Sequence, residues 1–256
     1  YASLDPRQRI YDGGAREAGI LSALGLASRS VALLETWRCS PCVSRLAALF
    51  LPGSDEREAF LRQARTAPIE REKPLLYVSS GAADEIDRLA EVARARLLRG
   101  ERVAVLLPGR RLVHRFAAGL EERGVPVEVP WRHGQEEGPF PALDFASDLV
   151  KVMPFHSAKG ITFDAVLLPR LGASDFSTRS DASLRRLLFV GITRATSRVY
   201  LGLREGPLLP LLAEAGLLSG APEVVVQTHA SRSPASPPSA TGIDDASRDD
   251  SDDDLG

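Results

Sequence analysis

Two apolar runs with an amphipathic segment between them decide the fold: PLLYVSS (74–80) and RVAVLLPG (102–109). Short and continuously apolar runs of this kind are typical of buried strands. Between them, apolar residues recur at helical spacing from Ile86 to Leu97, and Gly100 follows as a helix-ending residue. A strand, a helix and another strand in this order predict a parallel βαβ unit.

The same alternation extends along most of the chain on both sides of this unit. Further apolar runs predict strands, and amphipathic stretches predict helices. A chain of this pattern is expected to form an α/β fold, a parallel sheet with helices on both faces. The additional strands are expected at 31–35, 125–129, 149–155, 164–169 and 198–203, and the additional helices at 40–51, 54–66, 110–122, 182–195 and 207–217.

Length and composition restrict the class of protein. The chain has 256 residues, of which 44% are hydrophobic and 26% are charged, as in soluble globular proteins. No apolar run approaches the roughly 18 residues that a membrane span needs, so no membrane partner is expected. The chain opens at Tyr1, and Met153 is its single methionine, from which we expect a piece of a longer protein.

Charge is distributed unevenly along the chain. Residues 230–256 contain seven aspartates and two arginines, whereas the rest of the chain has a net charge of +3. Because residues 229–256 are rich in Ser, Pro and Asp and have little to bury, they are expected to form a disordered acidic tail. Such a tail is a solvated spacer or an arm for a protein partner, and the basic body is compatible with nucleic acid.

The common phosphate-binding and metal-binding signatures are missing. The sequence has no G-x-x-x-x-G-K-[ST] and no G-x-G-x-x-G, which excludes a self-sufficient P-loop ATPase and a Rossmann dehydrogenase. Cys39 and Cys42 form a single C-x-x-C, and no further cysteine can complete a zinc site. We interpret the pair as two half-buried thiols at a helix start in a reducing cytosol, with a redox motif as the alternative.

Four separated motifs occur in a fixed order. They are DPRQRIY (5–11), LLETWRCS (33–40), PFHSAKGITFDAVLL (154–168) and LRRLLFVGITRA (184–195). Together they resemble motifs III, IV, V and VI of the UvrD/Rep/PcrA-like superfamily 1 DNA helicases. The resemblance covers about residues 1–205.

Helicases of this family consist of two RecA-like domains with ATP in the cleft between them. The resemblance implies that residues 1–27 are the end of the first domain, that 28–228 form the second RecA-like domain, and that 229–256 are the tail. It implies ATP with Mg²⁺ as cofactor, the P-loop and the Mg²⁺ ligands being expected in an N-terminal RecA-like half. The implied function is the motor domain of an ATP-dependent helicase or translocase moving 3′ to 5′ on single-stranded or duplex DNA, inactive as this fragment alone.

The resemblance also assigns residues to ATP. Arg38 and Arg194 match arginines that contact the γ-phosphate, and both are expected at loop edges of the sheet, where α/β proteins bind ligands. An arginine placed there raises the rate of phosphoryl transfer about 10³–10⁵-fold. Gln8 matches a glutamine that senses the γ-phosphate. Gly160 lets the backbone turn tightly towards a phosphate or ribose, and Thr162 stands where the family usually has a ribose-binding glutamate.

A second group of residues is assigned to DNA. Tyr11 offers a ring for base stacking, worth about 1–3 kcal/mol per base, or it is a core tyrosine. His156 matches a DNA-contacting histidine, although a single histidine would otherwise be interpreted as structural. Ser157 and Lys159 lie on the same turn, and Asp164 is expected to fix that turn.

The chain departs from the family pattern in several places. Ser183 and Leu184 replace the acidic residues that usually precede RRL, and YDGGAR lacks the aromatic residue that normally follows the motif III tyrosine. Only residues 130–148 separate two of the expected strands, so the large helical insertion of UvrD and Rep cannot fit. We therefore expect a compact relative with a minimal second motor domain.

Two other functions remain open. The chain could be a catalytically silent DNA-binding or protein-interaction module derived from a helicase, although a silent ATPase has no use for Gln8, Arg38 and Arg194. An unrelated nucleotide-binding α/β enzyme has no complete fingerprint in its favour. A cytoplasmic location, associated with the nucleoid in a bacterium, is expected for the motor.

Overall fold

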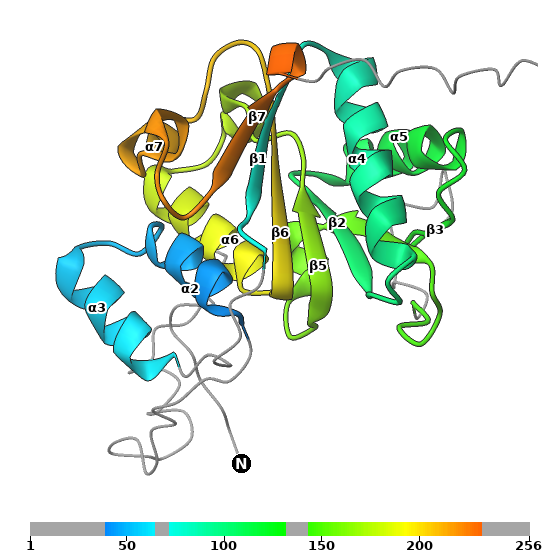
Figure 1. The fold of residues 1–256 in the computed structure, drawn as a ribbon. Coiled ribbons are helices and arrows are strands. Elements are labelled where there is room, and N and C mark those ends of the chain that lie inside the picture. The colour runs from blue at the N-terminus through cyan, green and yellow to red at the C-terminus, as the bar shows by residue number, and fades with distance from the viewer. Residues whose placement is uncertain (1–38, 65–71, 132–142, 232–256) are drawn as a thin grey trace, which may run out of the picture.

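The computed structural model describes residues 39–64, 72–131 and 143–231 (Figure 1). The strand expected at 31–35, the first motif (5–11) and most of the expected tail lie outside these residues. None of the described helices is both long and apolar enough to cross a membrane.

Within the described residues, seven strands form one sheet in which all neighbouring strands run parallel. Their order across the sheet is β3-β4-β2-β5-β6-β1-β7. The parallel sheet predicted from the alternating pattern is therefore confirmed. The strands are β1 (Leu75–Ser79), β2 (Val103–Leu107), β3 (Val127–Glu128), β4 (Val150–Pro154), β5 (Phe163–Leu168), β6 (Ala195–Arg204) and β7 (Val225–Thr228).

Helices cover both faces of this sheet, as Figure 1 shows. Each described α-helix overlaps a helix that the sequence predicts, while the short 3₁₀ segments were not predicted. The α-helices are α2 (Pro41–Ala48), α3 (Ser54–Gln63), α4 (Ala82–Leu97), α5 (Arg110–Glu121), α6 (Asp181–Ile192) and α7 (Pro210–Glu214). The 3₁₀ segments are η2 (Phe155–Ala158), η3 (Ala173–Phe176), η4 (Leu217–Ser219) and η5 (His229–Ser231).

The two faces of the sheet carry separate apolar cores, and the side chains of β2 alternate between them. Val103, Val105 and Leu107 belong to the core under α4 and α5. Ala104 and Leu106 belong to the core under α2 and α6. All five are fully buried, as predicted for a strand covered on both faces.

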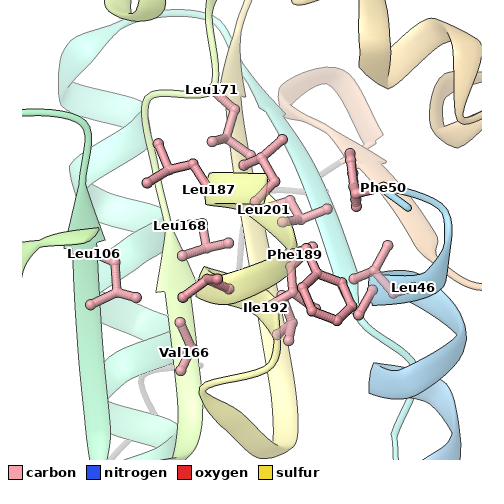
Figure 2. Packing of buried hydrophobic residues seen from close by; sticks show 14 of the residues in the cluster. Leu46, Phe50, Leu106, Val166, Leu168, Leu171, Leu187, Phe189, Ile192 and Leu201 are labelled. Atoms are coloured by element: carbon pink, nitrogen blue, oxygen red, sulfur yellow. The ribbon is translucent and has the colours of Figure 1, made fainter. Parts of the chain in front are cut away.

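Helix α6 links the sheet to α2 and α3. Phe189 of α6 meets Phe60 of α3 edge-on, with ring centroids 5.2 Å apart. Figure 2 shows the α6 side chains between those of the sheet and those of the α2 region. The labelled residues of this core include Leu187, Phe189 and Ile192 from α6, Val166, Leu168 and Leu201 from the sheet, and Leu46 and Phe50 from the α2 region.

The path of the chain across the sheet explains which helix covers which face. From β1 through β2 to β3 the chain moves towards one edge, with α4 and α5 as connections. From β4 through β5 and β6 to β7 it moves back towards the other edge, with α6 and α7. Because connections between parallel strands are almost always right-handed, the change of direction places the second set of helices on the opposite face.

The connection between β4 and β5 is a crossover, formed by residues 155–162. The two strands are not neighbours, because β2 lies between them. Pro154 ends β4 beside Leu107, at the carboxyl end of β2, whereas Ala165 of β5 pairs with Val103 at its amino end. The crossover therefore passes from the carboxyl edge of the sheet to the amino edge.

A glycine turn lies within this crossover. Gly160 has a φ of 85°, and the amide of Ile161 donates to the carbonyl of Ala158 at 3.1 Å. The tight turn predicted at Gly160 is confirmed. The prediction does not include the 3₁₀ segment η2, which precedes the turn. It also does not include the passage of the chain across β2, because local sequence does not reveal which strands pair.

Gly191 allows α6 to pack closely on the beginning of the crossover. A Cβ at this position would lie 2.6 Å from Cε1 and 2.9 Å from Cδ1 of Phe155. The Phe155 ring is only 3% exposed and meets Phe176 edge-on, with centroids 6.3 Å apart, so it has little room to move. The segments 154–168 and 184–195 are therefore in direct contact at this glycine.

Gly191→Ala is expected to lower the free energy of unfolding by about 2 kcal/mol. Overpacking a core destabilises a protein by about 1–3 kcal/mol, and we expect a loss near the upper value here. The higher helix propensity of alanine offsets about 1 kcal/mol of this loss. Urea denaturation measures the loss. In a Phe155→Leu background the same substitution is expected to be neutral or stabilising, and an equal loss in both backgrounds would contradict the steric explanation.

Candidate functional site

The residues assigned to ATP and DNA are found at two opposite edges of the sheet. Gln8, Tyr11 and Arg38 lie outside the described residues. Arg194 and the end of the crossover lie at the amino edge, where the strands begin. His156 lies at the carboxyl edge, directly after β4.

Arg194 occupies the junction of α6 and β6. Its carbonyl accepts the amide of Phe163, the first residue of β5, at 2.9 Å. Its side chain is fully buried, with Nε donating to the carbonyl of Val190 at 3.1 Å and Nη1 to that of Ile161 at 3.5 Å. The guanidinium therefore contacts the end of the crossover, and the two motifs assigned to ATP meet there.

The position of Arg194 is unusual for a ligand-binding residue of an α/β sheet. Ligands of open α/β sheets usually bind at the carboxyl ends of the strands. Arg194 does lie at a loop edge, as expected, but at the amino edge. A ligand that reached it would approach the sheet from the side on which strands β2, β5 and β6 begin.

Polar contacts fix the start of β5 beside Arg194. Asp164 accepts the backbone amide of Arg102 at 2.9 Å and the hydroxyl of Thr196 at 3.3 Å. These bonds tie the start of β5 to β2 and β6, so Asp164 holds the strand that follows the turn rather than the turn itself. Thr162 is half-buried just before it and offers a short hydroxyl where the resemblance to superfamily 1 helicases predicts a glutamate.

An apolar shelf lies next to Thr162. Phe145 and Leu149 are 38% and 37% exposed, and with Ile161 they line a shallow cavity of about 30 Å³. The Phe145 ring lies 6.3 Å from that of Phe163, between centroids. No pattern in the sequence predicts this shelf, because Phe145 and Leu149 both lie in the connection before β4, outside any motif.

His156 lies among positive charges at the carboxyl edge. Its burial, and then the nearby guanidinium groups of Arg110 and Arg179, lower the pKa of His156 below its usual range, so the imidazole is neutral at neutral pH. Ser157 follows, and its buried Oγ has no hydrogen-bond partner among the described residues. Lys159 is exposed on the turn.

A second group of charges lies at the carboxyl ends of β5 and β6. Glu85 of α4 is fully buried and accepts the backbone amide of Arg170 at 2.9 Å and Nε of Arg204 at 2.8 Å. Arg170 has a φ of 64° and forms an ion pair with Asp175. A cavity of about 280 Å³ lies beside Arg170 and Arg204. Sequence reasoning missed this group, whose members belong to different elements.

Glu72 forms ion pairs with three arginines at the amino edge. Its carboxylate lies 2.7 Å from Arg99, 2.8 Å from Arg96 and 2.9 Å from Arg198. The hydrogen bond from Arg99, together with the other two guanidinium groups, holds the pKa of Glu72 at about 2. The cluster fastens the segment before β1 to the end of α4 and to β6.

Glu72→Gln is expected to cost about 1 kcal/mol of stability at pH 7, a value reduced for the solvent exposure of the carboxylate. Because the folded-state pKa is depressed, the contribution of Glu72 is complete above its unfolded value of about 4.5 and disappears as the pH falls towards about 2. Urea denaturation from pH 7 to pH 3 checks this. Glu58→Gln, in the exposed pair with Arg62, is the control and should show no such pH dependence.

Ser183 and Leu184, which stand where the resemblance to superfamily 1 helicases predicts acidic residues, have structural roles. The amide of Ser183 donates to Oγ of Ser180, the N-cap of α6, at 3.3 Å. Leu184 is 3% exposed and belongs to the core. The described residues contain no group of three or more His, Cys, Asp or Glu side chains that could hold a metal ion.

Comparison with known proteins identifies a helicase-like segment. Residues 149–201 match the model of the UvrD-like helicase C-terminal domain, and they comprise β4, the crossover, β5, α6 and most of β6. No curated protein sequence matches the chain.

Solved structures resemble the fold. The C-terminal domain of a possible DNA helicase from Lactobacillus plantarum WCFS1 has 18% identity and a TM-score of 0.54, covering 75% of this chain and 98% of that one. The C-terminal domain of the DEAD-box protein Dbp5 has 15% identity and a TM-score of 0.40, covering 61% of this chain and 89% of that one. The sheet and the first of these matches show the expected RecA-like α/β fold.

Proposed function

We propose that this chain, with its segment similar to UvrD-like helicase C-terminal domains, is the second RecA-like motor domain of an ATP-dependent DNA helicase or translocase that moves 3′ to 5′. The match of residues 149–201 carries the proposal, because this segment contains both the crossover and Arg194. The amino edge of the sheet then faces ATP, and the carboxyl edge faces DNA.

Arg194, at the amino edge, and Arg38 act on the γ-phosphate. The guanidinium of Arg194 donates to the neutral carbonyl oxygens of Val190 and Ile161. A phosphate oxygen is a stronger acceptor than a carbonyl because it is charged, so ATP at this edge can draw the guanidinium away from them. Turned outwards, the arginine stabilises the charge of the transferred phosphoryl group.

Other residues contact the rest of the nucleotide. The turn at Gly160 and the hydroxyl of Thr162 lie where the ribose is expected, and Gln8 senses the γ-phosphate. The sequence has no loop that could grip a triphosphate by itself. A partner RecA-like half therefore supplies the phosphate loop and the ligands of Mg²⁺, and the shelf of Phe145 and Leu149 offers it an apolar contact.

At the carboxyl edge, a cluster of basic side chains follows the DNA backbone. Arg110 and Arg179 supply the positive charge that attracts phosphates, and Lys159 is exposed further along the crossover, on the glycine turn. His156 is neutral and contacts DNA through a hydrogen bond. Ser157, whose buried hydroxyl has no hydrogen-bond partner among the described residues, contacts DNA after its side chain turns towards the surface. Tyr11 stacks on a base.

The crossover joins the two edges covalently. Its first part carries His156, and the carbonyl of Ile161, near its end, accepts Nη1 of Arg194 at 3.5 Å. When DNA displaces the crossover at the carboxyl edge, the residues that contact the nucleotide at the amino edge therefore move as well. This connection is the basis on which hydrolysis and stepping are coupled in the proposed motor.

ATP hydrolysis with and without a P-loop half tests the proposal. The chain alone is expected to hydrolyse no ATP above background, with or without single-stranded DNA. After addition of the RecA-like half encoded upstream or in a neighbouring gene, hydrolysis is expected and should be stimulated by single-stranded DNA. Robust hydrolysis by the chain alone would contradict the proposed division, and no hydrolysis by the pair would favour the silent module.

A further inference from the structure

A cavity of about 280 Å³ lies at the carboxyl edge of the sheet, where β5 and β6 end. Ligands of open α/β sheets usually bind at this edge. None of its lining residues belongs to the proposed contacts with ATP or DNA. They are Arg170, Gly172, Ser174 and Asp175 after β5, and Arg204, Glu205, Gly206 and Pro207 at the end of β6 and after it.

Backbone contacts hold the two loops together around the cavity. Gly172, after β5, forms an antiparallel bridge with Leu208, after β6. The amide of Ala173 donates to the carbonyl of Pro207 at 3.1 Å. Each loop therefore fixes the other, and the cavity is part of the fold rather than a gap between two independent loops.

Arg170 is held in an uncommon conformation beside this cavity. Its φ is 64°, which non-glycine residues rarely adopt. Its amide donates to the buried carboxylate of Glu85 at 2.9 Å, and its Nε donates to Asp175 at 3.1 Å. Backbone conformations of this kind persist only where the surroundings enforce them, and they are frequent where a protein holds a ligand.

Arg204 brings a hydrogen-bond donor to the cavity that the protein itself leaves without an acceptor. Its Nε donates to Glu85 at 2.8 Å, but its Nη2 is buried and has no hydrogen-bond partner among the described residues. Buried polar groups nearly always bond to protein, water or a ligand. The exposed hydroxyl of Ser174 lines the same cavity. These donors suit a ligand that has acceptor oxygens.

The charges around the cavity restrict the kind of ligand. The carboxylates of Asp175 and Glu85 balance the guanidinium groups of Arg170 and Arg204. A group with one negative charge can therefore bind, whereas a second negative charge would be repelled by these carboxylates and by Glu205 at the rim. Because the donors come from two loops and not from one planar guanidinium, they suit a tetrahedral phosphate better than a planar carboxylate.

We propose that this cavity binds a phosphodiester group of the DNA backbone. Such a group has one negative charge, and its two free oxygens accept hydrogen bonds from Nη2 of Arg204 and from the hydroxyl of Ser174. DNA as the source of the phosphodiester rests on the proposed function, in which the carboxyl edge faces DNA. A free phosphate ester has the same chemistry, and two separate measurements distinguish these sources.

Dimethyl phosphate, a small phosphodiester with one negative charge, tests the cavity without DNA. In an NMR titration of the chain, the amide signals of Gly172, Ser174 and Gly206 are expected to shift and to saturate in the millimolar range. Acetate and the doubly charged form of methyl phosphate are expected to bind more weakly. The absence of a saturable shift at these amides, or tighter binding of either competitor, would overturn the proposal.

Two variants with the same change of charge separate the cavity from the surrounding surface. Ser174→Asp places a negative charge beside the phosphate and is expected to weaken dimethyl phosphate binding about tenfold. Ser177→Asp, three residues further along the same segment and outside the cavity lining, is the control and should change binding less than twofold. Both serines are exposed, so both variants should melt like the original chain. Equal losses would show that the cavity does not hold the phosphate.

A fluorescent oligothymidylate tests DNA as the source. Ser174→Asp is expected to weaken its binding about tenfold and to reduce the slope of log affinity against log salt concentration by about 0.7, the loss of one phosphate contact. Ser177→Asp should again be nearly neutral. If Ser174→Asp weakens dimethyl phosphate but not DNA, DNA is not the ligand. A chain that binds dimethyl phosphate here but no DNA at all would refute the proposed function, while the cavity would remain a site for a free phosphate ester.

Discussion

Replacing Arg194 by lysine is expected to lower DNA-stimulated ATP hydrolysis about 10³-fold when the P-loop half is present. Lysine keeps the positive charge but lacks the planar fork that lets one side chain bond the phosphate and retain a protein contact. Since the group is needed in the transition state, kcat should fall while nucleotide affinity changes little. Steady-state hydrolysis and equilibrium binding of a fluorescent ATP analogue separate the two effects.

Arg185→Lys provides the matched control for this experiment. Arg185 lies on the same helix and forms an ion pair with Glu214, away from the amino edge. Its replacement is expected to leave the rate within twofold. Because Arg194 is buried, a thermal melt must accompany both variants. If a properly folded Arg194→Lys variant kept more than a tenth of the original rate, Arg194 would not act on the γ-phosphate.

Glu85→Ala is expected to lower the free energy of unfolding by about 3–4 kcal/mol, the cost of leaving a buried ionic contact half unmade. The carboxylate is fully buried and serves two donors, Nε of Arg204 and the amide of Arg170. Its removal leaves both without their partner and also releases Arg170 from a left-handed backbone conformation that non-glycine residues rarely adopt. Urea denaturation with tryptophan fluorescence measures the loss.

The control for Glu85 is Glu91→Ala on the same helix. Glu91 is 35% exposed in its pair with Arg88, so its removal is expected to cost less than about 1 kcal/mol. Adding Arg204→Met to the Glu85→Ala variant should recover part of the loss, because the unpaired guanidinium is then absent. A cost for Glu85→Ala no larger than for Glu91→Ala would show that the buried pair does not stabilise the fold.

Most of the fold follows from local patterns, because a strand buried on both faces must be apolar throughout. This is why 102–109 and 164–169 predict strands at the observed places. The sequence does not predict strand β7, because its apolar run is short. Val225 and Val226 lie at the edge of the sheet and are 44% and 36% exposed. The order of the strands depends on which surfaces pack, and no short stretch of sequence contains that information.

The candidate site shows the same limit. The motifs place Gly160, Thr162 and Arg194 close together, and the structure brings the crossover and Arg194 into contact. They do not show that His156 lies at the opposite edge of the sheet from these residues. The charges around Glu72 and Glu85 are also unpredictable, since their partners come from distant parts of the chain.

The crossover between β4 and β5 is short for a connection between parallel strands. Parallel strands are usually joined by a dozen or more residues, often with a full helix, whereas this connection has the eight residues 155–162. Four of them are wound into η2 and the next ones into the glycine turn. We expect this short connection to tolerate changes of side chain better than changes of its length. If one residue more or fewer shifted β5 against β2, the side chains of β5 that face the core under α4 and α5 would exchange places with those that face the core under α2 and α6.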